Sequence, residues 1–505
     1  MDTAGQVAYL SYLSGDGQRI TLLHYDLRAE RLGERSTVQS DTHRVRVTFG
    51  SLADGLSYYR QMLSKDMPLE DSTPRWTREM TLLEVLPSYF PGGFRGLTRK
   101  LPYYREIGFN TIYLMPHWVG GYSPIDPFAA EPSYGTAEDL REMVRVAHSL
   151  GMRVLFDMVI HGFGPKSPIV RQHPEFFQKD EHGLLVPHHV WGSMATHPAS
   201  PAYQQYMVDL ALHDIRTYGI DGYRVDANNF RMPNWDPTLP YPPWQSAAGT
   251  RQLLSRIYQA IRAVKPDAVL LSEIFGPVWH SICNLVHDNT AMGPQFILEK
   301  MEQREVTAAH YKAHLANELA ALPKGANRVY FARNHDTSWF YRFNGYTPRF
   351  LAMDAIHILL GIPEVFAGEP KNKPNPDDDP AVFAYYRKLF RVRKELPELA
   401  AGATLLDEVE CDNPWVFTGL RRLNARLVLV AISLSDREEN ASLALHMDRG
   451  AFPGARETQR PVILRMLDPV REEVVGVQNA GGASAGIMLT LKPFQVLVGR
   501  MQSPW

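Results

Sequence analysis

The sequence predicts an α/β fold: a (β/α)8 TIM barrel that follows a small N-terminal β domain and precedes a C-terminal antiparallel β sandwich. Three observations predict it. Between about residues 80 and 398, apolar strand-like segments alternate with segments whose apolar residues recur at helical spacing. Strand-like segments without helical stripes lie before and after this part. With 505 residues, the chain is long enough for a barrel of about 250 residues and two smaller domains.

Residues 1–75 alternate apolar and polar side chains in short runs. Examples are Val7–Leu10 and Val45–Phe49, and polar turns separate the runs. This pattern predicts a small antiparallel β domain. Lys65–Arg78 contains two prolines and several charges, so we interpret it as the linker to the barrel.

The barrel is predicted from eight apolar strands separated by amphipathic stripes. One stripe runs from Leu140 to Leu150 and another from Leu253 to Val264, with the 3.6-residue period of helices. The predicted strands are Thr81–Leu86, Thr111–Met115, Arg153–Val159, Gly222–Asp226, Val269–Glu273, Pro294–Leu298, Val329–Arg333 and Pro363–Ala367.

Two further parts complete the predicted architecture. Residues 162–201 are too many for a plain βα turn and are rich in His, Pro and Gly, so we expect an inserted loop region beside the barrel mouth. Strand patterns return after the barrel, for example at 425–432 and 486–491, so residues 400–505 are predicted to form the β sandwich.

Composition excludes several partners. The net charge is −2, the pI is about 6.8 and no dense run of Lys and Arg occurs, so neither nucleic acid nor a membrane surface is an expected partner.

Cys283 and Cys411 give no disulfide framework and no metal-ligand spacing. Residues 1–5 lack the features of a signal peptide and no run is long enough to span a bilayer, so we expect a cytoplasmic protein. The oligomeric state is left open.

Polar residues stand where four of the predicted strands end. A closed barrel brings the C-terminal ends of its strands to one mouth, so residues distant in sequence meet there. A carboxylate kept ionised by a guanidinium, with a second carboxyl group nearby, is the arrangement that glycosidic bond cleavage requires. The residues at these ends are Asp157, Arg224, Asp226, Glu273, Asn334, His335 and Asp336.

Each of these motifs also has a structural interpretation. Arg224 and Asp226 could form an ion pair at a strand end, Glu273 could cap a helix, and 334–336 could form a turn. A metallohydrolase site built from Asp157, His161 and His335 is disfavoured because Arg224 would repel the ion. His188 and His189 are adjacent, so their side chains are not expected to converge on one metal. We therefore predict no metal site.

The four segments resemble the four short conserved regions of the α-amylase family, glycoside hydrolase family 13, and occur in that family's order. Gly121–Asp126 and Tyr134–Leu140 resemble the family's second βα loop, and the C-terminal sandwich is similar to its trailing domain. The resemblance covers roughly residues 80–500.

The resemblance implies a role for each residue. Asp226 would be the nucleophile, Glu273 the general acid and base, and Asp336 the group that holds two sugar hydroxyls. The substrate-binding residues would be Tyr122, Asp157, His161, Arg224, Asn334 and His335. Retention by double displacement would require the Asp226 and Glu273 carboxyl groups to lie about 5–5.5 Å apart.

One segment departs from the family pattern. His161 and Gly162 stand where the family has Asn and His, which ligate a structural calcium and contact the sugar's hydroxymethyl group. An imidazole is a poor ligand for calcium, so we predict neither a calcium site nor any other cofactor. Gly162 is expected to leave room at the sugar's hydroxymethyl edge, for a different ring orientation, a substituent or a compensating side chain from another loop. Trp118, Trp191 and Trp235 are candidate glucan platforms with core packing as the alternative, and 368–380 is either an acceptor-side loop or a solvated one.

The expected function is that of a retaining enzyme acting on α-1,4-linked glucans or small α-glucosides, in intracellular carbohydrate metabolism. Hydrolysis and transglycosylation share the same glycosyl-enzyme, so a cytoplasmic glycosyltransferase or isomerase, maltosyltransferase-like or trehalose-forming, stays open. A non-catalytic glucan-binding barrel is a third hypothesis, which the intact carboxylates Asp226, Glu273 and Asp336 disfavour.

Overall fold

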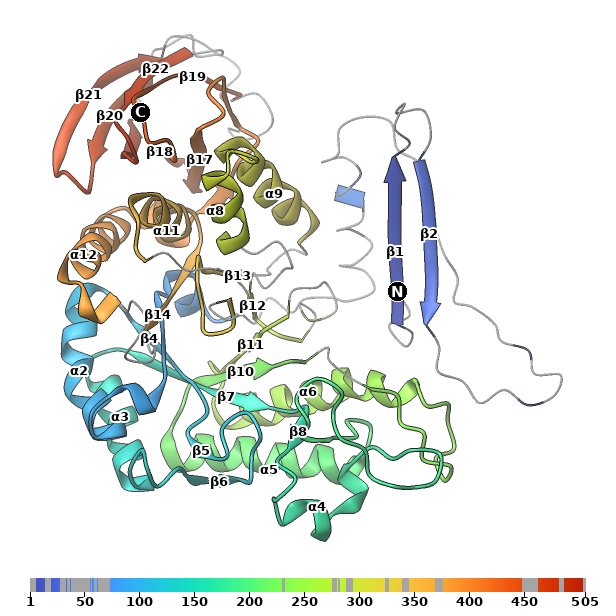
Figure 1. Cartoon of the computed structure of the whole chain (residues 1–505). Coiled ribbons are helices and arrows are strands. Elements are labelled where there is room, and N and C mark those ends of the chain that lie inside the picture. Colours follow the sequence, from blue (N-terminus) through green and yellow to red (C-terminus); the bar gives the residue numbers. More distant parts are fainter. Residues whose placement is uncertain are drawn as a thin grey trace.

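The computed structural model describes most of the barrel and parts of the flanking regions. The described residues are 6–13, 20–27, 33, 37, 55, 57–58, 61, 73–228, 232–274, 279, 282–287, 294–322, 327–337, 345–367, 376–446, 462–480 and 486–502. A barrel ringed by helices forms the centre of the molecule, C-terminal sheets pack at one end of it, and an N-terminal hairpin stands beside it (Figure 1).

Eight parallel strands close into a barrel, which confirms the predicted fold class. Their order around it follows the chain, and the last strand pairs with the first. The strands are β3 (Leu82–Val85), β4 (Thr111–Leu114), β7 (Arg153–Val159), β10 (Gly222–Asp226), β11 (Val269–Ser272), β12 (Leu285–His287), β13 (Asn327–Tyr330) and β14 (Ile362–Ala367).

The sixth strand was predicted at the wrong place. Pro294–Leu298 begins the helix α8 (Pro294–Glu302), and the sixth barrel strand is the three-residue β12. A short apolar run does not distinguish a strand from a helical turn, and Pro294 stands at the helix start, where proline is favoured. Since β12 contains only Leu, Val and His, its pattern is too short to identify from sequence.

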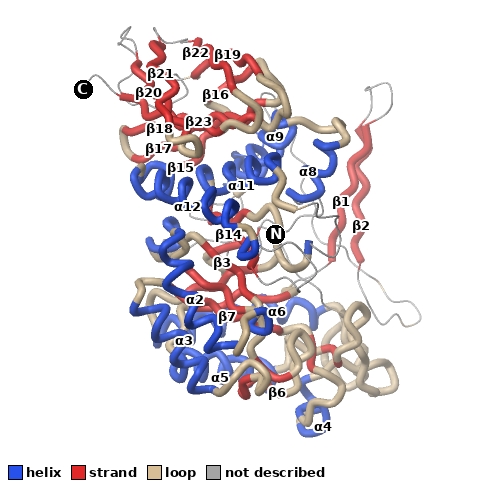
Figure 2. Tube along the Cα trace, turned by 60° about the vertical axis from the view of Figure 1, so that its left-hand side comes forward, coloured by secondary structure: helices blue, strands red, loops and turns tan. Residues whose placement is uncertain are grey.

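Helices surround the barrel and cover its outer face, as Figure 2 shows. The predicted stripe of α3 is buried at Leu140, Met143, Val144 and Ala147, and Thr136 and Asp139 form a capping box at its start. The principal helices are α2 (Gly93–Ile107), α3 (Ala137–Ser149), α5 (Pro201–Tyr218), α6 (Gln245–Val264), α8, α9 (Ala308–Ala321), α11 (Pro348–Leu360) and α12 (Pro380–Glu395). Shorter elements are η1 (Arg75–Glu79), η2 (Pro87–Tyr89), β5 (Trp118–Val119), β6 (Asp126–Ala130), β8 (Gly162–Phe163), α4 (Ile169–Gln172), η3 (Pro174–Phe176), β9 (Met194–Ala195), η4 (Pro376–Asp378) and α13 (Pro397–Ala401).

Alternation along the strands separates two apolar clusters. Leu83 and Val85 of β3 pack outward into the large cluster shared with the helices. Leu82 belongs to a second cluster, inside the barrel, together with Tyr113 and Leu155 of the neighbouring strands. Gly222 begins β10 with φ +145°, and a Cβ there would lie 2.0 Å from the carbonyl oxygen of Val269. Glycine at this position therefore lets β10 approach β11, and this places Asp226 at the barrel mouth.

The C-terminal part forms two antiparallel sheets, which confirms the predicted sandwich. One sheet has the order β15-β17-β18-β23-β20-β21 and the other the order β16-β19-β22, with a separate apolar core. The strands are β15 (Ala403–Leu405), β16 (Val409–Cys411), β17 (Val416–Leu423), β18 (Arg426–Ser433), β19 (Glu439–Leu445), β20 (Val462–Asp468), β21 (Glu473–Ala480), β22 (Gly486–Leu491) and β23 (Val496–Gln502).

The N-terminal part contains an antiparallel hairpin of β1 (Gln6–Leu13) and β2 (Ile20–Leu27). The predicted run Val7–Leu10 lies within β1, whereas Val45–Phe49 and residues 65–72 lie outside the described residues. The domain boundaries at 75 and 400 therefore stay predictions. Cys283 and Cys411 are both free, as predicted. Within the described ranges, none of the helices has the length and apolar character needed to cross a membrane.

Candidate active site

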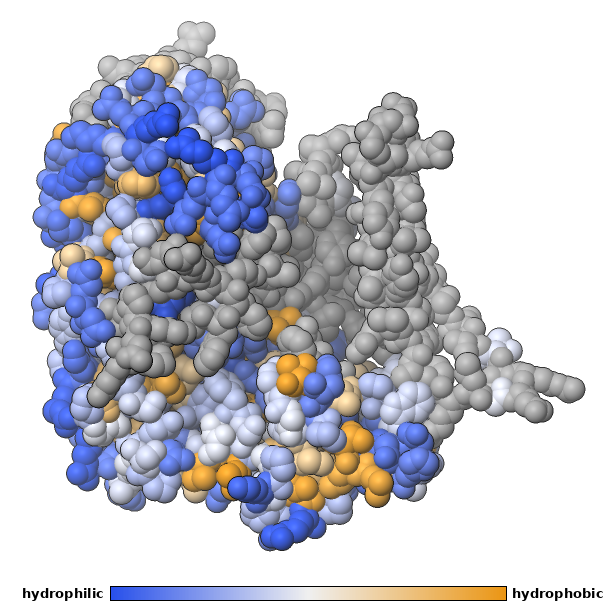
Figure 3. All heavy atoms as spheres, viewed as in Figure 1, coloured by the Kyte–Doolittle hydropathy of each residue, from blue (hydrophilic) through white to orange (hydrophobic). Residues whose placement is uncertain are grey.

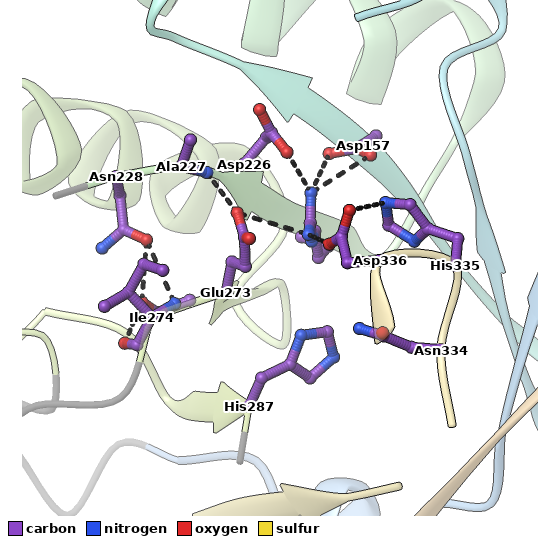
Figure 4. Close-up of polar contacts among 12 residues, drawn as sticks. Asp157, Asp226, Ala227, Asn228, Glu273, Ile274, His287, Asn334, His335 and Asp336 are labelled. Carbon is purple, nitrogen blue, oxygen red and sulfur yellow. Dashed lines mark hydrogen bonds and ion pairs between the residues drawn. The ribbon is translucent and has the colours of Figure 1, made fainter. Parts of the chain in front are cut away.

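The ends of four strands bring the predicted polar residues together at one end of the barrel. Parallel pairing places Arg224 of β10 opposite Asp157 of β7, and Glu273 follows β11 directly. Figure 4 shows Asp157, Asp226, Glu273 and Asp336 pointing toward one another from separate segments. The structure therefore assembles the four carboxylates that the strand-end pattern predicted.

Arg224 is the common partner of these carboxylates. Its side chain is fully buried. Nη1 lies 2.6 Å from Asp226 Oδ1 and 3.4 Å from Asp157, whereas Nη2 lies 3.3 Å from Glu273 Oε2 and 3.6 Å from Asp336 Oδ2. A buried guanidinium is stable only when its charge is compensated, and here four acidic groups surround it. The cation at the centre of this site is thus an arginine side chain.

Asp226 is held as a carboxylate. Its Oδ1 accepts a hydrogen bond from Arg224, and its Oδ2 lies 3.2 Å from Nε2 of His161. Burial by itself would raise the pKa of Asp226, but the charge of Arg224 and the hydrogen bond from His161 outweigh it and lower the pKa below its usual range. Asp226 is therefore ionised at neutral pH, as a nucleophile must be.

The pKa of Glu273 is shifted in the opposite direction, upward. Burial, together with the neighbouring charges of Asp226 and Asp336, raises its pKa to about 8 although Arg224 opposes the shift. The backbone N–H of Ala227 donates to Glu273 Oε2. Ala227 has φ +45°, a left-handed conformation that is unfavourable for alanine and that the surrounding structure must stabilise. Glu273 is thus protonated at neutral pH, as a general acid must be.

His335 and Asp336 form the third part of the site, beside Asp226 and Glu273. His335 Nδ1 contacts Glu84 Oε1, and its backbone N–H donates to Glu84 Oε2 at 3.3 Å. Burial would lower the pKa of His335, but the charges of Asp336 and Glu84 raise it to about 10. Its charged ring places Nε2 3.3 Å from Asp336 Oδ1. Asp336 is the most exposed of the four carboxylates, with 34% of its side chain accessible.

Asp157 and Tyr122 connect Arg224 to His335 through their contacts. Asp157 Oδ2 accepts hydrogen bonds from Tyr113 at 2.6 Å and from Tyr122 at 2.7 Å, and burial raises the pKa of Asp157. The Tyr122 ring stacks on His335 at a centroid distance of 5.4 Å, and its hydroxyl lies 3.0 Å from His335 Nε2. Tyr122 is therefore fixed by contacts on both sides of the site.

Asn334 holds the turn that carries His335 and Asp336. Its Oδ1 accepts from the backbone N–H of Thr337 at 2.9 Å, and its backbone N–H donates to Thr337 Oγ1 at 3.0 Å. Asn334 is 1% exposed. The turn interpretation offered by the sequence is thus correct for this residue, and its contact with substrate stays a prediction.

At Gly162 the structure shows one of the expected alternatives, a side chain from another loop in the space beside the glycine. A Cβ at this position would lie 2.3 Å from Ser193 Oγ and 2.9 Å from the carbonyl oxygen of Met194. Ser193 therefore fills the space that the missing side chain of Gly162 leaves. Gly162 pairs with Ala195 in the small β8-β9 sheet, so its lack of a side chain permits that close pairing.

Replacing Gly162 by Ala is therefore expected to destabilise the protein by about 1–3 kcal/mol, because the added methyl group overlaps Ser193. Urea unfolding measures this change. Gly486→Ala is the matched control: a Cβ there meets nothing within 4 Å, so its free energy of unfolding should stay within about 0.5 kcal/mol of the parent protein. If Gly162→Ala and Gly486→Ala were equally stable, the close approach of Ser193 to Gly162 would be contradicted.

Several residues of the site were not predicted from sequence. Glu84 and Glu364 are acidic residues inside otherwise apolar strands, and this contrast is the sequence signal that could have identified them as residues of the site. Glu364 Oε2 lies 2.6 Å from His287 Nε2. His287, labelled in Figure 4, was missed because β12 was misplaced. Tyr113 was interpreted only as part of a strand.

The candidate platforms differ in exposure. Trp118 is 2% exposed and its Nε1 donates to the carbonyl of Gly121, so core packing describes it. Trp235 is half-buried, and its backbone N–H donates to the carbonyl of Lys179. Trp191 is 41% exposed and lies against His161. Most of the 368–380 segment lies outside the described residues.

The calcium site implied by the resemblance does not fit the donors present. His161 offers an imidazole where oxygen is preferred, and its Nε2 already contacts Asp226. In the part of the chain that the structure describes, no group of three or more His, Cys, Asp or Glu side chains is arranged to hold a metal ion. His188 and His189 stack on each other at a centroid distance of 4.8 Å.

Comparisons with known proteins show what the chain is similar to. The family model for the alpha-amylase catalytic domain matches residues 39–176. The chain is 23% identical over 404 residues to a cyclomaltodextrinase of Thermoanaerobacter pseudethanolicus, covering 70% of this chain and 65% of that protein. It is 28% identical over 279 residues to an intracellular maltogenic amylase of Bacillus subtilis, covering 49% and 43%. The match thus spans less than two thirds of the length of these curated relatives.

Solved structures share the fold. A noncanonic maltogenic alpha-amylase, AmyB of Thermotoga neapolitana, superposes with a TM-score of 0.68 at 17% identity, covering 84% of this chain and 99% of that one. An alpha-amylase of Geobacillus thermoleovorans in complex with acarbose gives a TM-score of 0.63 at 18% identity, covering 85% and 99%. These structures show that the chain has the fold of α-amylases, and the sequence matches show that it is similar to proteins of the α-amylase family over part of its length.

Proposed function

We propose that this protein is a retaining enzyme that acts on α-1,4-linked glucans or short α-glucosides. The observation that carries the proposal is the opposite protonation of two carboxyl groups that contact the same guanidinium. The pKa of Asp226 is lowered and that of Glu273 is raised to about 8, so at neutral pH one is a nucleophile and the other an acid.

In the first step, Asp226 attacks the anomeric carbon while Glu273 gives its proton to the leaving oxygen. The glycosidic bond breaks as the bond to Asp226 forms, and the configuration inverts once. In the second step, the Glu273 carboxylate takes a proton from the incoming water or hydroxyl, which displaces Asp226. The second inversion restores the α configuration, and Glu273 is protonated again for the next cycle.

Other groups orient the reacting ring. Asp336 is the most accessible of the four carboxylates, with the charged His335 beside it, and this supports a role in accepting hydrogen bonds from two sugar hydroxyls. Tyr122 presents the ring that packs on His335. One curated relative is named a cyclomaltodextrinase and another an intracellular maltogenic amylase. These names support the α-glucan substrate and a cytoplasmic location.

A time course on maltotriose tests the proposal. A hydrolase is expected to raise the concentration of reducing ends steadily, and proton NMR of the first turnover should detect the α anomer of the new reducing end. Longer chains or a non-reducing disaccharide at constant reducing ends would make the enzyme a transferase or isomerase. A β anomer formed first would contradict the double displacement, and no reaction with any α-glucoside would contradict the function.

A further inference from the structure

Glu84 lies inside the barrel, where a charged side chain is unusual. Barrel interiors are filled mainly by apolar side chains, and Leu82 of the same strand belongs to such a cluster. Figure 3 shows hydrophilic residues gathered on the surface around the C-terminal sheets, where water solvates them. Glu84 is instead 0% exposed. A buried carboxyl group is costly unless it is paired and hydrogen-bonded, so the partners of Glu84 indicate why it is present.

Both oxygens of Glu84 contact one residue, His335. Oε1 lies against the ring nitrogen Nδ1, and Oε2 accepts a hydrogen bond from the backbone N–H of His335 at 3.3 Å. The first contact sets the direction of the imidazole ring, and the second holds the turn that carries it. The Tyr122 ring stacks on the same imidazole, with 13° between the two planes. Glu84 therefore fixes the ring of His335 from inside the barrel.

The other ring nitrogen of His335 faces the catalytic groups. Nε2 lies 3.3 Å from Asp336 Oδ1 and 3.0 Å from the hydroxyl of Tyr122. That hydroxyl donates its single proton to Asp157 Oδ2 at 2.7 Å, so its oxygen can only accept from Nε2. Nε2 therefore carries a proton. An imidazole with a carboxylate at each nitrogen is favoured in its doubly protonated, charged form.

Charged groups on several elements surround the pair of Glu84 and His335. The charges of Asp336 and Glu84 raise the pKa of His335, against the effects of burial and of Arg224 on β10. Burial raises the pKa of Glu84, the charge of His335 opposes this shift, and Glu364 on β14 adds to it. Both shifts act in the same direction, so the proton between the carboxyl group and Nδ1 is held strongly.

We propose that Glu84 is a positioning residue of the reaction, which keeps His335 charged and directs its Nε2–H toward the sugar hydroxyls beside Asp336. The inference rests on the proposed function and adds to it a residue that does not touch the substrate. Asp336 then accepts from the sugar while His335 donates to it, and the fixed geometry of donor and acceptor holds the ring that Asp226 attacks.

Glu84→Gln keeps the shape of the side chain and removes its charge. At about pH 5.5, below the ordinary histidine pKa of about 6.5, the ring still takes up a proton, so kcat/KM on maltotriose should stay within about threefold of the parent value. At about pH 8 the ring of the variant is neutral, and kcat/KM should fall about tenfold or more. The ratio of parent to variant activity should therefore grow as the pH rises. A purely structural defect would lower both values by the same factor.

Two further variants separate charge from packing. Glu84→Asp retains the charge on a shorter side chain, so it should lose activity by a similar factor at both pH values. Glu398→Gln is the matched control, because Glu398 is a buried carboxylate outside the barrel mouth, with Oε1 3.2 Å from Arg500 Nη2. It loses the same charge and should keep the parent activity at both pH values. Thermal unfolding checks that each variant is folded.

Nitrogen NMR of the histidine rings measures the charge of His335 in the substrate-free protein. His335→Asn identifies the signals by their loss. At about pH 8 both ring nitrogens of the parent protein should be protonated, and in Glu84→Gln the ring should be neutral. A neutral ring in the parent, or a Glu84→Gln activity ratio that does not change with pH, would overturn the proposal. If the parent acted on no α-glucoside, the proposed function would fail, and NMR would still decide whether Glu84 keeps His335 charged.

Discussion

Asp226→Asn is expected to lower kcat on maltotriose by a factor on the order of 10⁴ or more, because an amide oxygen cannot form the glycosyl-enzyme bond. The substitution preserves the shape of the side chain, and Asn Oδ1 can still accept from Arg224, whose Nη1 lies 2.6 Å away in the parent protein. KM should change much less than kcat, since Asp226 acts on the reacting carbon. Initial rates of reducing-end formation measure both.

The matched control is Asp209→Asn, on the exposed face of α5, where the carboxylate accepts a hydrogen bond from Gln205. It loses the same charge and should retain the parent rate. Thermal unfolding of both variants checks that the folded protein is being compared. If Asp226→Asn kept more than about one hundredth of the parent kcat, a nucleophilic role for Asp226 would be excluded.

Glu273→Gln is expected to cause the second large loss of activity. It should lower kcat on maltotriose by about 10²–10⁴, because the leaving oxygen receives no proton. The parent enzyme should lose activity as the pH rises through about 8, since the pKa of Glu273 is raised to about 8 and its acid form is then lost. On the acid side, activity should persist well below neutrality, because Asp226 stays ionised there. The variant should lack the alkaline loss.

α-Glucosyl fluoride separates the two roles of Glu273. Fluoride leaves without a proton, so Glu273→Gln should still form the glycosyl-enzyme from this substrate, and then stall because no base activates water. Azide needs no base, so it should restore turnover and yield an α-glucosyl azide. A variant that retained the alkaline loss, or that azide did not accelerate, would assign the acid and base role to another group.

The barrel and the carboxylates at its strand ends could be predicted from sequence because their signals are local. Arg224 and Asp226 end an apolar strand, and Glu273 follows another, so the rule that strand ends meet at the barrel mouth places them together. The sixth strand could not be found, because Leu285–His287 is too short to carry a pattern. His287 was lost with it.

The remaining features of the site could not be predicted, because they depend on contacts between residues that are distant in sequence. Nothing within β3 indicates that Glu84 binds His335, which is 251 residues away. The substitution at Gly162 was visible in the sequence, but its meaning depended on Ser193, which only the fold brings to the vacant position. Trp191 was a candidate among three tryptophans, and its stacking on His161 is what distinguishes it from the buried Trp118.

The most direct test of the account is to trap the glycosyl-enzyme. A fluorinated α-glucosyl fluoride that reacts quickly but hydrolyses slowly should add one sugar to the intact protein, and peptide mapping by mass spectrometry should locate it on Asp226. Excess maltotriose, as acceptor, should release the sugar and restore activity. An adduct on any other residue, or turnover without an adduct, would contradict the double displacement through Asp226.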